Sequence, residues 1–137
     1  MATVNVTLSL SSTDLFAKQN LSFTETDVLT PAGDQQLIGK LFLTGSGTED
    51  QITLKQLDGT DDRAYLYMKN TSVTTGEYVE VSARRSAYGT DSTANDFFSV
   101  LGPGEFLFIP ISNLLNVDLE PATGNPVVEY ILMEKAA

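Results

Sequence analysis

The alternation of apolar and polar residues constrains the fold of this 137-residue chain more than any other feature. Near the N-terminus, four apolar residues alternate with Asn, Thr and Ser; they are Val4, Val6, Leu8 and Leu10. Successive side chains of a β-strand point to opposite faces, so the pattern predicts a strand with one buried face. No segment of ten or more residues carries the apolar spacing of an amphipathic helix. Only residues 11–20 break the alternation in a way that favours a short helical turn, capped by Ser12 or Thr13.

Further strand patterns recur along the chain, separated by turns rich in glycine, proline and aspartate. They fall within residues 21–30, 36–44, 51–57, 64–72, 77–85, 96–101, 105–112, 114–120 and 126–135. Gly39, inside one of them, is expected to mark a β-bulge. Eight to ten short strands without helical crossovers predict an all-β protein, an antiparallel two-sheet β-sandwich that is jelly-roll-like and has little helix. With no internal repeat or linker, residues 1–137 are expected to form a single β-sandwich domain.

The composition argues against an enzyme. The chain has neither cysteine nor histidine, which excludes disulfides, cysteine-ligated metals and Ser–His catalysis. The acidic turn at Asp58, Asp61 and Asp62 lacks the alternate-residue spacing and the final glutamate of a calcium loop. The glycine-rich segment at residues 45–48 lacks the lysine and the helix of a phosphate-binding loop. We therefore expect no catalytic residue, no metal and no cofactor.

The charge restricts the partners. Eighteen acidic residues against eight basic ones give a formal net charge of −10, which disfavours binding to nucleic acid and to anionic membrane surfaces. No basic residue precedes the alternating N-terminal segment, so a cleaved secretory signal is not expected. The apolar runs are also shorter than the roughly 20 residues that a membrane-spanning helix needs.

The segment LGPGEFLFIPI, residues 101–111, raises the question of what the protein binds. In an extended chain Phe106 and Phe108 point to one side, and Leu107, Ile109 and Ile111 point to the other. Both faces of this strand are therefore apolar. Either it is a central strand whose second face lies under a loop, or that face is an interface between subunits. The candidate interface residues are Phe97, Phe98, Phe106 and Phe108.

Three hairpin features in residues 64–137 occur together. A strand ends in a Lys-Asn-Thr turn, a Pro-Gly-Glu turn precedes an apolar strand ending in proline, and the chain closes with a Glu-Tyr-hydrophobic strand. The residues are Lys69, Asn70, Thr71, Pro103, Gly104, Glu105, Pro110, Glu129 and Tyr130. This combination resembles small β-sandwich structural proteins of tailed bacteriophage virions, of the kind seen in marine and cyanobacterial phages. The resemblance implies a virion component without catalytic positions.

We therefore expect a capsid decoration protein on the outer head surface, made in the host cytoplasm and assembled as a homo-oligomer, most simply a trimer. Its partners would be its own copies and the major capsid protein or other virion proteins. An acidic protein suits the outside of the capsid because packaged DNA would repel it. The alternative is a neck or tail adaptor, or a fibre or spike protein that binds carbohydrate. In the last case the stacking residues would be Tyr65, Tyr67, Tyr78 and Tyr88. Residues 86–95 are expected to form an exposed loop.

Overall fold

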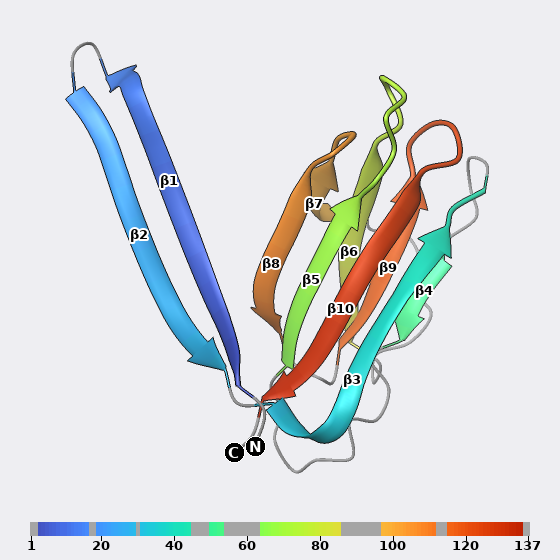
Figure 1. Ribbon diagram of the computed structural model, residues 1–137. Helices are drawn as coiled ribbons and strands as arrows, with labels where there is room; N and C mark the ends of the chain where they lie inside the picture. The colour runs from blue at the N-terminus through green and yellow to red at the C-terminus, as the bar shows by residue number, and fades with distance from the viewer. Residues whose placement is uncertain are drawn as a thin grey trace.

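The computed structural model describes residues 3–16, 19–29, 31–44, 50–53, 64–85, 97–111 and 115–135. All regular secondary structure in these ranges is β (Figure 1). The strands are β1 (Val4–Phe16), β2 (Gln19–Leu29), β3 (Pro31–Phe42), β4 (Asp50–Thr53), β5 (Ala64–Asn70), β6 (Val79–Arg85), β7 (Phe97–Leu101), β8 (Phe106–Ile111), β9 (Leu115–Pro121) and β10 (Val127–Lys135).

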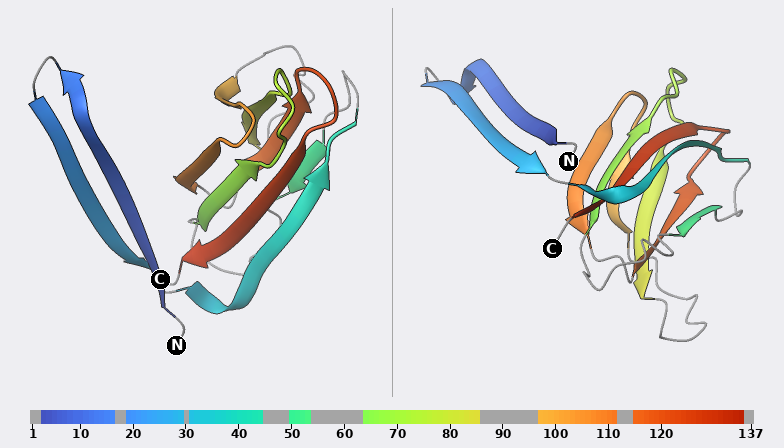
Figure 2. Two further views of the ribbon diagram at one scale, coloured as in Figure 1. Left: turned by 45° about the horizontal axis from the view of Figure 1, so that its top comes forward. Right: turned by 60° about the horizontal axis from the view of Figure 1, so that its bottom comes forward.

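Eight of these strands form a sandwich of two antiparallel sheets (Figures 1 and 2). Sheet I has the order β3-β10-β5-β8, and sheet II has the order β4-β9-β6-β7. The pairing is nested, because β3 lies beside β10, β4 beside β9, β5 beside β8 and β6 beside β7. This is the strand order of a jelly roll. The predicted all-β, jelly-roll-like sandwich is confirmed.

The hydrophobic core lies between the two sheets. Sheet I contributes Leu66, Met68, Val128 and Leu132, and sheet II contributes Val79, Val81, Val117 and Leu119. Each of these residues is at most 2% exposed. They occupy alternate positions on β5, β6, β9 and β10, as expected for strands with one face toward the core.

The two-faced strand β8 follows the predicted alternation. Leu107, Ile109 and Ile111 pack against the core, which leaves Phe106 and Phe108 on the outer face of sheet I. In the described part of sheet I, β8 pairs only with β5 and forms the edge of the sheet. The alternative explanation of a central strand therefore does not hold for these residues.

A long hairpin of β1 and β2 extends away from the sandwich (Figures 1 and 2); we call it the arm. Its pairing runs in register from Val4 opposite Leu29 to Ser12 opposite Leu21. The prediction of a helical turn within residues 11–20 is wrong, because β1 continues to Phe16 and β2 begins at Gln19. Serine and threonine favour turns only locally, and pairing with a second strand overrides that preference.

Gly39 does not form the predicted bulge, because it lies in regular register opposite Tyr130. A Cβ atom at this position would lie 2.7 Å from the Tyr130 hydroxyl oxygen and 2.8 Å from Cζ. The glycine is therefore needed for the close approach of the tyrosine ring. The irregularity in this pair of strands lies further along, between Met133 and Lys135.

The two turns identified in the sequence meet at one end of the sandwich, around the buried Asn70. Its Nδ2 donates hydrogen bonds to the backbone oxygens of Glu77 (2.8 Å) and Leu101 (3.1 Å). Its Oδ1 accepts one from the Ser72 amide at 3.0 Å. The Asn70 backbone also donates to the Glu105 oxygen and accepts from the Gly104 amide. One asparagine thus joins the turn after β5 to the turn between β7 and β8.

Candidate functional site

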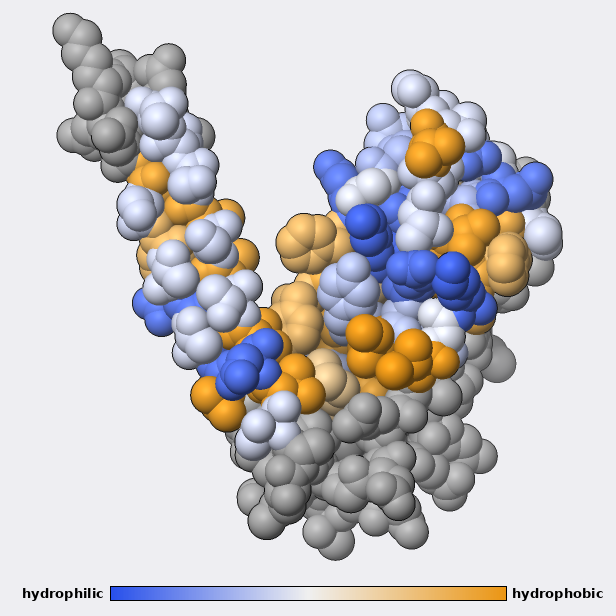
Figure 3. Space-filling view, in the orientation of Figure 1, coloured by the Kyte–Doolittle hydropathy of each residue, from blue (hydrophilic) through white to orange (hydrophobic). Residues whose placement is uncertain are grey.

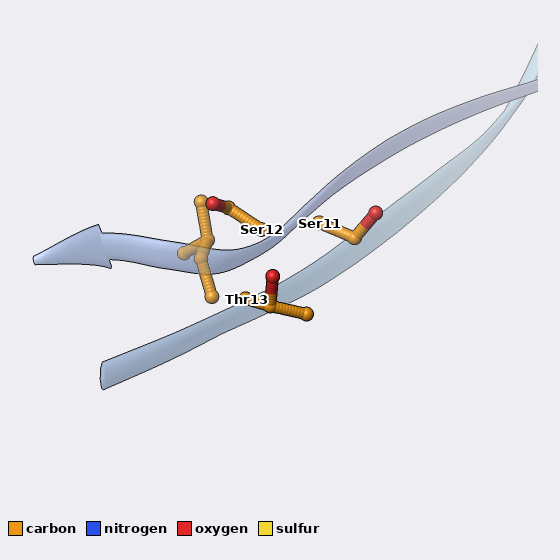
Figure 4. Close-up of a pocket in the computed structure, with 4 residues that line it drawn as sticks. Ser11, Ser12 and Thr13 are labelled. Atoms are coloured by element: carbon orange, nitrogen blue, oxygen red, sulfur yellow. The ribbon is translucent and has the colours of Figure 1, made fainter. Parts of the chain in front are cut away.

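Acidic side chains and surface depressions are the first candidates for a site in the described part of the chain. Nowhere in the described ranges do three or more acidic side chains gather as a metal site would require. Among the depressions on the described surface is one near the end of the arm, lined by Ser11, Ser12, Thr13 and Leu21 (Figure 4). Its described lining consists of three hydroxyl-bearing side chains and one leucine. No helix in the described part is long and apolar enough to cross a membrane.

The outer face of sheet I is a more informative surface, because its side chains lie in rows across neighbouring strands. One row is mostly charged and contains Phe106, Lys69, Glu129 and Lys40. The next row is apolar and contains Phe108, Tyr67, Ile131 and Ile38. A third contains Pro110, Tyr65 and Met133, with Gln36 at its β3 position. Two adjacent, largely apolar rows on an outward face are unusual for a sheet exposed to water.

Aromatic contacts order one side of this face. Tyr65 stacks on Phe108 with ring centroids 5.9 Å apart and an interplanar angle of 13°. Tyr67 lies beside Phe106 with centroids 6.3 Å apart and an angle of 35°. Tyr65 is only 9% exposed, whereas Phe106 is 62% exposed. These four rings form an aromatic cluster that is covered at Tyr65 and open at Phe106.

The arm covers the closed end. Val4 and Val6 pack against the cluster formed by Tyr65 and Met133, together with Phe108 and Ile131. Residues directly opposite each other on antiparallel strands point to the same face. The face that begins at Val4 and Val6 therefore continues along both strands of the arm, through Leu8, Leu10, Phe23, Glu25 and Asp27. We call it the apolar face of the arm.

The opposite face of the arm is polar. The hydroxyl groups of Thr7 and Thr26 lie 3.3 Å apart, and those of Ser9 and Thr24 lie 3.5 Å apart. Such cross-strand pairs of hydroxyl groups stabilise a hairpin that has water on that side. The apolar face is the one that would gain from contact with another surface.

The arm and sheet I diverge from their junction and leave a V-shaped notch between them (Figure 3). Apolar residues border the notch on both sides. On the arm, Leu8, Leu10 and Phe23 are 48%, 47% and 41% exposed. On the outer face of sheet I, Phe106 of the edge strand β8 is 62% exposed, and Ile38 and Phe42 reach 69% and 68% on β3, the opposite edge strand.

The four predicted interface phenylalanines are divided between the two sheets. Phe106 and Phe108 lie on the outer face of sheet I, at the notch. Phe97 and Phe98 belong to β7 at the edge of sheet II, where Phe98 is 47% exposed. The four side chains therefore do not form one patch.

The part that the arm plays in this surface is not evident from the sequence. The alternation from Val4 to Leu10 predicts a strand with one buried face, but Leu8 and Leu10 are about half exposed. Glu25 and Asp27 occupy apolar-face positions of β2. Two carboxylates on a face otherwise occupied by Leu and Phe are the sequence signal that this face is not fully buried in the chain's own core.

The described tyrosines of the carbohydrate-binding alternative lie in two different places. Tyr65 and Tyr67 lie on the outer face of sheet I, where Tyr65 is covered. Tyr78 precedes β6 and lies beside Gly102, in the turn after β7. Tyr88 lies outside the described residues, as do the expected loop at 86–95, the acidic turn at 58–62 and the glycine-rich segment at 45–48.

Comparison of the chain with protein-family models, with curated proteins and with solved structures gave no match.

Proposed function

We propose that this protein is a non-enzymatic structural component of a tailed-bacteriophage virion, and that it decorates the outer surface of the capsid as a homo-oligomer. The observation that carries the proposal is the exposed apolar surface on both sides of the notch. Soluble monomers rarely leave contiguous apolar patches of more than a few hundred Å² uncovered, and such patches mark sites of association. The function proposed is therefore assembly.

The fold is compatible with this proposal but does not by itself identify the function. Jelly rolls occur in viral capsid proteins, but also in lectins and cupins, so the fold by itself does not identify an activity. The hairpin features around Asn70 and Gly104, which resemble those of phage sandwich proteins, meet in one hydrogen-bonded end of the domain. They support a stable scaffold that presents the notch.

The oligomer proposed is a trimer. Most homo-oligomers close by rotational symmetry, and capsid lattices provide three-fold points at which a small ring can sit. The net charge of −10 favours the outside of the head, because packaged DNA phosphates would repel an acidic protein in the interior. The major capsid protein beneath the ring would be the second partner.

The carbohydrate-binding alternative has less support. Stacking of a sugar requires an open aromatic face, and the Tyr65 ring is covered by Phe108 and by the base of the arm. A neck or tail adaptor would need the same apolar interface as a decoration protein, and the location in the virion separates these two roles.

Two measurements test the proposal. Gold labelling or cryo-electron microscopy of virions should place the protein on the outer head surface; copies confined to the tail would overturn the decoration role. Sedimentation velocity at micromolar concentration should give a species of three times the 14.8 kDa chain mass. A stable monomer at that concentration would overturn the preformed trimer.

A further inference from the structure

We infer that the arm of one copy packs, through its apolar face, against the outer face of sheet I of a second copy. This inference rests on the proposed self-association and names the segment that brings it about. Each chain would then both offer an arm and receive one, so that a ring of copies has every notch occupied.

The arm requires a partner for its outer half. An isolated two-stranded hairpin is marginally stable at best in water, unless its apolar face packs on something. Among the described residues, Val4 and Val6 are the arm residues that pack with the sandwich cluster. Leu8, Leu10 and Phe23 continue the same face and remain 41–48% exposed. The outer half of the arm thus carries an interface without an occupant in the single chain.

The contact at the junction shows what kind of surface the apolar face accepts. Val4 and Val6 already pack on the aromatic and aliphatic side chains of sheet I. From that point the arm leads away from its own sandwich (Figures 1 and 2). Its outer apolar positions therefore border the notch and lie beyond the contact that Val4 and Val6 make with sheet I. A second copy offers the same kind of surface, with Ile38 and Phe106 more than 60% exposed.

The two surfaces carry opposite net charge. The apolar face of the arm carries Glu25 and Asp27, and the charged row of sheet I carries Lys69 and Lys40 on either side of Glu129, which forms an ion pair with Lys40. On both surfaces the charged row lies two residues along the strand from an apolar row, a distance of about 6.8 Å. The Leu10–Phe23 pair can therefore lie over an apolar row while Glu25 lies near Lys69. The two faces could then pack about 10 Å apart, as sheets do in sandwiches.

The absence of cysteine from the sequence makes this contact directly testable. The variants Leu10→Cys and Ile38→Cys, each in the full chain and differing in mass by a tag, are mixed under mild oxidation. We expect a mixed disulfide between the two chains, with about tenfold or higher yield than in the control mixture of Thr24→Cys and Ile38→Cys. Thr24 lies on the polar face of the arm, so it should not reach the sheet.

Two results of this experiment would overturn the inference. The first is a mixed-disulfide yield no higher than that of the control. The second is efficient formation of an intramolecular disulfide in the double variant Leu10→Cys/Ile38→Cys, because the arm would then close on its own sheet.

A second experiment separates this inference from the proposed function. In the double variant Leu10→Ser/Phe23→Ser we expect the dissociation constant of the oligomer to rise at least about tenfold, because the inferred interface loses two apolar side chains that it would bury. The control Val28→Ser, at a 59% exposed position on the polar face, should leave it unchanged. Far-UV circular dichroism verifies that the sandwich stays folded. Oligomers that persist in the double variant would overturn the arm contact while leaving the proposed self-association intact.

Discussion

Replacement of Asn70 by alanine should destabilise the fold more than its position at the end of a strand suggests. The side chain is fully buried and makes three hydrogen bonds, two to backbone oxygens and one from a backbone amide. A typical hydrogen bond contributes about 1 kcal/mol net, and leaving buried partners unsatisfied costs about 1–3 kcal/mol more. We therefore expect a loss of about 3–5 kcal/mol. The total stability of a domain is only about 5–15 kcal/mol.

Urea denaturation followed by far-UV circular dichroism measures this loss, and the absence of tryptophan makes fluorescence a less suitable probe. For a chain of 137 residues, the same loss corresponds to a fall in melting temperature of about 10–17 °C. The protein concentration has to be the same for all variants, because self-association stabilises the folded form by mass action. The exposed Asn5 on the arm provides the matched control, and Asn5→Ala should change the stability by less than about 0.5 kcal/mol. A loss below about 1 kcal/mol for Asn70→Ala would refute the argument that this side chain joins the two turns.

Two further outcomes are expected. Gly39→Ala should lower the free energy of unfolding by about 1–3 kcal/mol, because the new methyl group would displace the ring of Tyr130. The additional change Tyr130→Leu should recover part of this loss in a double-mutant cycle measured by urea denaturation. An unchanged stability of Gly39→Ala would contradict the close approach of the two residues. Glu129→Gln removes the 3.0 Å ion pair with Lys40; the Glu129 side chain is 39% exposed and the Lys40 side chain 58%. The stability should therefore fall by less than about 1 kcal/mol, and the difference should shrink at high salt. A larger loss that does not depend on salt would show that the pair is not a surface interaction.

The sandwich could be predicted from the sequence because burial in a strand follows a period of two. Val79 and Val81 are buried as their alternation predicts, and so are Val128 and Leu132. These residues face a core that the chain itself supplies, so the local pattern and the tertiary environment agree. The same reasoning correctly placed Phe106 and Phe108 on the face opposite to Leu107.

The arm could not be predicted in the same way. Leu8 and Leu10 have the pattern of a core strand, and their exposure depends on whether a second sheet lies over them, which is a property of the tertiary structure. The separation of Phe97 and Phe98 from Phe106 and Phe108 could not be predicted for a related reason. Alternation assigns Phe98 to a face of its strand, but it does not tell which of the two sheets that strand joins.

The place of β10 within sheet I has a consequence for the order in which the protein folds. β10 lies between β3 and β5, and β9 lies between β4 and β6, yet these two are the last of the described strands to leave the ribosome. Neither sheet can therefore close until β9 and β10 have been synthesised, and both sheets depend on contacts between residues far apart in the sequence, which form slowly. Until then β3 and β5 present unpaired backbone edges that other strands can join. We expect the growing chain to be most prone to aggregation in this interval, and a lesion in β9 or β10 to reduce the soluble yield more than a comparable one in the arm.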